Sequence, residues 1–158
     1  MSSAGQTPQN NNGGQQNAQW AEDFYIYLAS FGNLAAGAST VQNLQVQSDS
    51  NFEWIETTVY GNLHGATPPF TDNILLPINI TIIDSGSSRQ LFSAPLPVSM
   101  FAGNGKQAFI LPVTRFFQAR SNIQITAQNT DAVSQYDNLF LALIGRKLFN
   151  LSATFSAT

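Results

Sequence analysis

The sequence contains no cysteine and only one histidine. Without cysteine there is no disulfide framework, no thiolate zinc site and no cysteine nucleophile. A single histidine also excludes His-rich metal sites and any mechanism that needs two imidazole groups. These absences remove many classes of enzyme, and we expect a protein that has no catalytic residues and needs no metal or cofactor.

Charged residues are scarce as well, at 9% of the chain against about a quarter in an average domain. Six Lys and Arg stand against nine Asp and Glu, which gives a net charge of −3. Such a chain lacks the basic stripe that nucleic-acid binding requires, so we expect no DNA or RNA partner. No apolar run approaches the roughly 20 residues of a membrane span, and no signal-peptide pattern opens the chain. We therefore expect a soluble protein, made in a cytoplasm, that does not bind membranes.

Three regions differ in composition. Residues 1–19 have no aromatic residue and are rich in Gly, Asn and Gln, which predicts a flexible arm that becomes ordered only on a partner. The composition changes at Trp20, and residues 20–149 are long enough for one domain with one core. Residues 150–158 are uncharged, and we predict an extended tail suited to adding a strand to a neighbour's sheet.

From Trp20 onward, short apolar runs alternate with turn residues, and no stretch keeps a helical period over three turns. This pattern predicts an all-β fold. Antiparallel strands without crossover helices favour a two-sheet sandwich with jelly-roll winding, and an up-and-down barrel is the alternative. The eight predicted strands are residues 22–31, 40–47, 52–60, 77–84, 89–94, 107–113, 122–128 and 138–148.

Alternation along these strands assigns the core. In the first strand, Phe24, Ile26 and Leu28 share one face while Tyr25 and Tyr27 share the other, so both faces are apolar enough to be covered. We place the first set inside. The predicted core consists of Phe24, Ile26, Leu28, Leu44, Val46, Trp54, Ile80, Ile82, Ile123, Ile125, Leu141 and Leu143.

A few polar residues are candidates for chemistry. Asp49, Glu53 and Glu56 lie close in sequence, as calcium ligands do. Glu53 and Glu56 point to opposite faces of a regular strand and converge only across a bulge, so we interpret them as solvated carboxylates. Asp84 precedes a Ser-Gly-Ser-Ser turn and is predicted to accept hydrogen bonds from the turn amides. His64 has no recognisable nucleophile or orienting partner nearby in the sequence, and we interpret it as a loop histidine.

Aromatic residues suggest two alternative roles. The pair Phe116-Phe117 follows Pro112, and we interpret it as a plug beneath a corner rather than a stacking platform. A carbohydrate-binding or host-attachment module would need an exposed aromatic row, and a hydrolase would need converging carboxylates. Neither is evident in the sequence. The candidate sugar platform would be drawn from Trp20, Trp54, Tyr60 and Phe70.

Four segments resemble the jelly-roll head-decoration, or cementing, proteins of tailed bacteriophages. They are SDSNFEWIETT (48–58), Ile82 to Leu91, PVTRFFQARSNI (112–123) and the closing GRKLF (145–149). The resemblance spans about residues 48–149, and the N-terminal arm is not part of it. It implies a structural virion protein on the outer capsid surface that bridges neighbouring capsomers against internal pressure. Its implied partners are the major capsid protein and further copies of itself.

Overall fold

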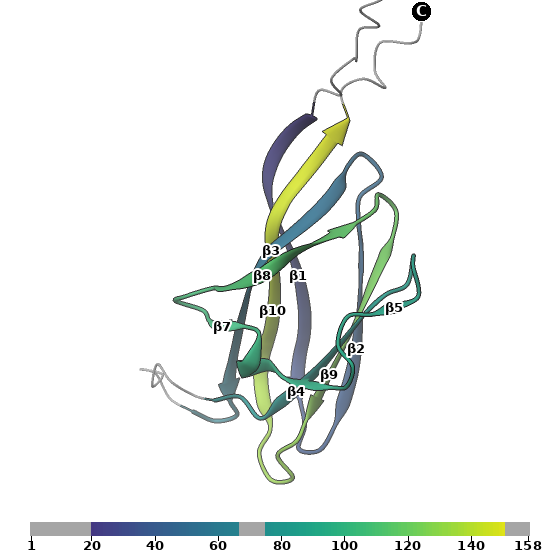
Figure 1. Ribbon diagram of the computed structural model, residues 1–158. Coiled ribbons are helices and arrows are strands. Elements are labelled where there is room, and N and C mark those ends of the chain that lie inside the picture. Colours follow the sequence, from purple (N-terminus) through teal and green to yellow (C-terminus); the bar gives the residue numbers. More distant parts are fainter. Residues whose placement is uncertain (1–19, 67–74, 151–158) are drawn as a thin grey trace, which may run out of the picture.

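Two β-sheets packed face to face form the part of the chain that the computed structural model describes, residues 20–66 and 75–150 (Figure 1). The long strands are rich in β-branched and aromatic residues, which suit a half-buried pleated surface. A three-residue 3-10 turn, η1 (Val98–Met100), is the one helical element in this part. The strands are β1 (Trp20–Leu34), β2 (Ser39–Gln45), β3 (Asn51–Leu63), β4 (Ile78–Asp84), β5 (Arg89–Gln90), β6 (Leu96–Pro97), β7 (Gly103–Asn104), β8 (Phe109–Phe117), β9 (Asn122–Asn129) and β10 (Tyr136–Asn150).

The first sheet has the order β1-β10-β3-β7, with β8 also paired to β3. The second has the order β2-β9-β4-β5, with β6 also paired to β4. All pairs are antiparallel except the two-residue β7, which runs parallel to β3. The predicted all-β sandwich is confirmed, but the structure describes ten strands instead of eight. The additional strands, β6 and β7, are two residues long, too short to leave an alternating pattern in the sequence.

The core lies between the two sheets. On β4, Ile78, Ile80 and Ile82 alternate inward, and on the neighbouring β9 Ile123 and Ile125 do the same. Leu44 is half-buried and packs against this core. Eight of the predicted core residues are at most 1% exposed, namely Val46, Trp54, Ile80, Ile82, Ile123, Ile125, Leu141 and Leu143.

The predicted orientation of β1 is wrong. Phe24, Ile26 and Leu28 are 72%, 43% and 53% exposed, whereas Tyr27 on the opposite face is 7% exposed. Tyr27 fits inside because its hydroxyl accepts a hydrogen bond from the backbone N–H of Gln47 at 2.9 Å, and a buried tyrosine needs such a partner. The apolarity of the two faces was similar, so the hydroxyl contact decides which one is covered.

A bulge corrects a second prediction. Ile144 lies opposite Glu56 while the next residue, Gly145, lies opposite Trp54, so Ile55 has no partner on β10. The extra residue brings Glu53 and Glu56 to the same outward face, because a bulge shifts the alternation by one position. The geometry of a regular strand, which would place the two carboxylates on opposite faces, does not apply here.

Some predictions fall outside the described residues. These are the arm at 1–19, the segment 67–74 with Phe70, and the tail from 151 onward. The backbone of Trp20 belongs to β1.

Candidate functional site

The outer surface of the first sheet is largely apolar. Register places side chains from four strands in rows, such as Ile26 beside Ile144, Glu56 and Ile110. Phe24 is 72% exposed, Ile110 67% and Phe116 61%. A contiguous apolar surface of this kind marks an interaction site in a soluble protein. We call it the apolar face; it consists of Phe24, Ile26, Leu28, Tyr60, Ile110, Phe116, Phe140 and Ile144.

Arg146 lies within the apolar face, between two carboxylates. Its Nε donates to Glu53 Oε2 and its Nη1 to Glu22 Oε2, each at 2.5 Å. The Glu53 side chain is 7% exposed, so it is a buried, paired carboxylate and not the solvated one that we predicted.

The ion pair also governs the protonation of Glu53. Desolvation opposes its ionisation, but hydrogen bonds from Arg146 and Thr114 outweigh this effect and hold the Glu53 pKa below its ordinary value. The hydrogen bond to Glu53 likewise raises the pKa of Arg146. The cation paired with the Glu53 carboxylate is therefore the Arg146 guanidinium group and not a calcium ion.

The outer surface of the second sheet has the opposite character. Its outward positions on β2, β9 and β4 contain no charged residue, and only Val41 and Ile83 are apolar. We call this surface the amide face; its other members are Ser39, Asn43, Gln45, Asn79, Thr81, Asn122, Gln124, Thr126 and Gln128. The sandwich therefore has one apolar and one uncharged polar surface.

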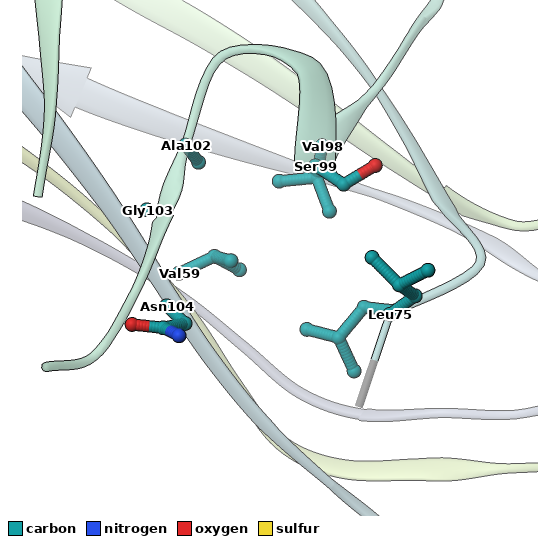
Figure 2. A pocket seen from close by; sticks show the side chains of 8 residues that line it. Val59, Leu75, Val98, Ser99, Ala102, Gly103 and Asn104 are labelled. Carbon is teal, nitrogen blue, oxygen red and sulfur yellow. The ribbon is translucent and has the colours of Figure 1, made fainter. Parts of the chain in front are cut away.

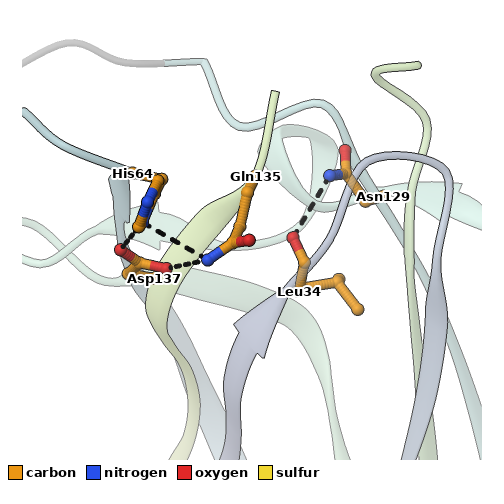
Figure 3. A network of polar contacts seen from close by, with 5 residues as sticks. All are labelled: Leu34, His64, Asn129, Gln135 and Asp137. Atoms are coloured by element: carbon orange, nitrogen blue, oxygen red, sulfur yellow. Dashed lines mark hydrogen bonds and ion pairs between the residues drawn. The ribbon is translucent and has the colours of Figure 1, made fainter. Parts of the chain in front are cut away.

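His64 has polar partners that the local sequence does not reveal (Figure 3). Its Nδ1 lies 2.6 Å from Asp137 Oδ2, and Gln135 Nε2 donates to Asp137 Oδ1 at 2.7 Å. The hydrogen bond from Gln135 and the contact with His64 lower the pKa of Asp137. His64 and Asp137 are 73 positions apart, so only the pairing of β3 with β10 brings them together.

The His64–Asp137 pair resembles the orienting half of a catalytic triad, but a triad also needs a nucleophile. In the described part of the chain, the hydrogen bonds of the His64 ring go to Asp137 and Gln135, and neither residue is a nucleophile of this kind. The His64 side chain is 64% exposed. The arrangement ties the end of β3 to β10.

The remaining predicted residues have structural roles. Asp84 accepts hydrogen bonds from Gly86 N and Ser87 Oγ, which confirms its role in the turn. Asp49 Oδ2 lies 3.5 Å from Lys147 Nζ. Phe117 is buried and stacks near Trp54, as a plug does, whereas its neighbour Phe116 is exposed.

The candidate sugar platform is incomplete. Trp54 is 1% exposed, so it cannot stack on a sugar, and Tyr60 is 45% exposed with its ring near that of Phe140. The side chains of Trp20 and Phe70 lie outside the described residues. Of the four candidate residues, Tyr60 is therefore the one whose described side chain is exposed.

A cavity of about 450 Å³ lies beside η1 and the start of β4 (Figure 2). Val59, Leu76, Val98 and Ala102 give it apolar walls, and Ser99 supplies a hydroxyl. Leu75, which also lines it, directly follows residues 67–74 in the chain. Because those residues are outside the described part, we assign no ligand to this cavity.

Within residues 20–66 and 75–150, no group of three or more His, Asp or Glu is placed to hold a metal ion. The same residues contain no helix of the length and apolarity that crossing a bilayer requires. No family model matches the chain, and no curated protein matches its sequence.

Proposed function

We propose that this chain is a non-enzymatic structural protein of a virion, which attaches to the outer surface of the capsid and cements neighbouring capsomers. The exposure of the apolar face carries the proposal, because three of its side chains are more than 60% exposed on one side of a β-sheet. A contiguous exposed apolar surface of this kind is suited to binding another protein surface. The chain would be made in the host cytoplasm before it binds the assembled shell.

The winding of the chain supports a jelly roll. With β6 and β7 set aside, the eight remaining strands pair first with last, second with seventh, third with sixth and fourth with fifth. These pairs are β1 with β10, β2 with β9, β3 with β8 and β4 with β5. Such a rolled antiparallel ribbon is the jelly-roll pattern found in viral capsid domains and in lectins. The pattern supports the fold more directly than the role.

The charges of the apolar face define the capsid surface that it would bind. Glu22, Glu53 and Glu56 stand against Arg146, so the face is apolar with a slight excess of negative charge. We expect the capsid contact to be apolar with a few basic residues at its rim. Since most of the area is uncharged, binding should depend only weakly on salt.

Self-association is the second part of the proposal. Among the described residues β1 pairs only with β10, so one edge of this 15-residue strand has no partner. Edge strands are commonly protected by proline, lysine or bulges. β1 contains neither proline nor lysine, and its register shifts are confined to its end, between Ser30 and Leu34. The edge is therefore suited to pairing with a second copy of the chain.

Co-sedimentation with empty, expanded capsid shells of the virus that encodes the chain tests the attachment. We expect the native protein to pellet with the shells, and Ile26→Lys to bind at least about tenfold more weakly, because a charge would be desolvated in the contact. Thr126→Lys places the same charge on the amide face and serves as the matched control. A native protein that stays in the supernatant would refute attachment to capsids. Equal losses in the two variants would refute the assignment to the apolar face.

A further inference from the structure

A second cavity, of about 320 Å³, lies between the sheets where β8 faces the segment after β5. Its volume is at the lower end of the range for small-molecule sites. Phe101 is 4% exposed and Trp54 1%, so one side of the cavity lies in the core, whereas Val113 and Arg115 on its other side are exposed. The residues that matter for its chemistry are Trp54, Phe92, Phe101, Phe109, Leu111 and Arg115.

Arg115 is the one charged residue among the described residues that line this cavity. It lies opposite Trp54 in the register of β8 with β3, and the next inward position on β8 is the buried Phe117. The register thus directs Arg115 toward the same side of the strand as Phe117, and the residue is exposed to solvent. No acidic residue in the described part of the chain lines the cavity beside it.

The Trp54 indole N–H, which lies beside the cavity, already has hydrogen-bond partners, whereas Arg115 has none among the described residues. The indole N–H of Trp54 donates to the Glu56 carbonyl and to Thr57 Oγ1, at 2.9 and 3.0 Å, so the ring offers only its apolar surface. Arg115 has no hydrogen bond or ion pair with any described residue. By contrast Arg146 is held by two carboxylates.

We propose that this cavity binds a small carboxylic acid with an aliphatic or aromatic body. The body would lie against Trp54 and Phe92, and the carboxylate would accept hydrogen bonds from Arg115. An arginine–carboxylate pair is charge-assisted and can be bidentate, so it favours an ionised acid over a neutral analogue of the same shape. The site is separate from the apolar face and does not depend on attachment to a capsid.

Titration of the ¹⁵N-labelled full chain with octanoate, at submicellar concentrations, tests the proposal by NMR. Uncharged 1-octanol is the matched probe, and the Trp54 indole N–H reports on the cavity while the Trp20 indole serves as an internal control. We expect saturable shifts at Trp54 and at least about tenfold tighter binding of octanoate than of octanol, the ratio that one charge-assisted hydrogen bond gives.

Variants of Arg115 complete the test. Arg115→Gln should bind octanol as the native protein does and lose the preference for octanoate, and Arg115→Lys, which keeps the charge, should retain part of it. Arg120→Gln, in an exposed turn, should change neither. A charged residue such as Arg115 on an edge strand also discourages aggregation. If this were its whole role, octanoate would cause no saturable shift of the Trp54 indole signal. Absence of the Trp54 shift, or an unchanged preference in Arg115→Gln, would overturn the proposal.

Discussion

Single residues of similar apolarity have different roles here because the sandwich covers one side of each strand. Ile82 is fully buried while Phe24 is 72% exposed. We expect Ile82→Ala to lower the free energy of unfolding by about 2–5 kcal/mol, since it leaves a cavity in the core. Phe24→Ala should change it by about 0.5 kcal/mol or less. Urea unfolding of both variants checks this, and a comparable loss in both would contradict the orientation of β1.

Asn129 holds two loops with one buried amide. Its Nδ2 donates to the carbonyls of Ala35 and Ser134, at 3.0 and 2.8 Å, and its Oδ1 accepts from Asp131 N. Figure 3 shows a further contact, to the Leu34 carbonyl. Removing the amide leaves these partly buried backbone groups without this partner. We expect Asn129→Ala to lower the free energy of unfolding by about 1–3 kcal/mol.

The matched control for this variant is Gln128→Ala, one position earlier on β9, where the side chain is exposed. It should leave the unfolding midpoint in urea almost unchanged. If the two variants unfold at the same urea concentration, the Asn129 hydrogen bonds contribute nothing measurable to the fold.

At the scale of the strand, the bulge of β3 opposite β10 depends on a glycine of β10. A Cβ added to Gly145 would lie 1.8 Å from the Glu53 carbonyl oxygen, so the backbone would have to move. At Gly105 the nearest atom would be at 3.7 Å. We expect Gly145→Ala to lower the free energy of unfolding by about 3 kcal/mol or more, and Gly105→Ala to change it by less than about 1 kcal/mol. Thermal unfolding compares the two variants. If Gly145→Ala unfolds at the same temperature as the native protein, β10 and β3 can move apart at this point without a loss of stability.

The strands also show what the sequence can predict. On β4, isoleucine alternates with Asn79 and Thr81, so the pattern has one apolar side and predicts the buried face correctly. On β1, apolar residues occupy both sides, and the choice depends on a hydrogen bond from Gln47 to Tyr27. That contact joins β1 to the loop between β2 and β3, and no local sequence pattern predicts it.

The candidate site was less predictable than the fold. The apolar composition of both sides of β1 indicated that a covered outer surface was needed, but its members on β8 and β10 follow only from strand register. The pairing of Glu53 with Arg146 spans 93 positions and depends on a bulge. The pairing of His64 with Asp137 likewise required the three-dimensional structure.

For the molecule as a whole, stability should fall in acid. The pKa values of Asp49, Glu53, Asp131 and Asp137 all lie below their ordinary values. At Asp49 and Glu53 hydrogen bonds and nearby cations outweigh desolvation, whereas at Asp131 and Asp137 hydrogen bonds dominate. A carboxyl group whose pKa is lower in the folded state stabilises the fold above its unfolded pKa, about 4, and loses this effect as the pH falls through the folded value.

We therefore expect a nearly constant urea midpoint between pH 7 and 5, and a decline below about pH 4. Glu53→Gln should be less stable than the native protein at pH 7 and should lose less on acidification, because one of the four groups no longer titrates. A urea midpoint that rises on acidification would contradict the direction of these shifts.

The place of β10 in its sheet determines when the chain can fold during synthesis. β10 lies between β1 and β3, so neither strand has this hydrogen-bonding partner until the ribosome has made residues 136–150. Domains usually fold as units while the chain emerges, but here the apolar side chains of β1 wait for the last strand. A chain that ends before Tyr136 keeps two open strand edges, which are templates for pairing with other chains. We expect such a fragment to be recognised by chaperones and proteases instead of folding as a smaller sandwich.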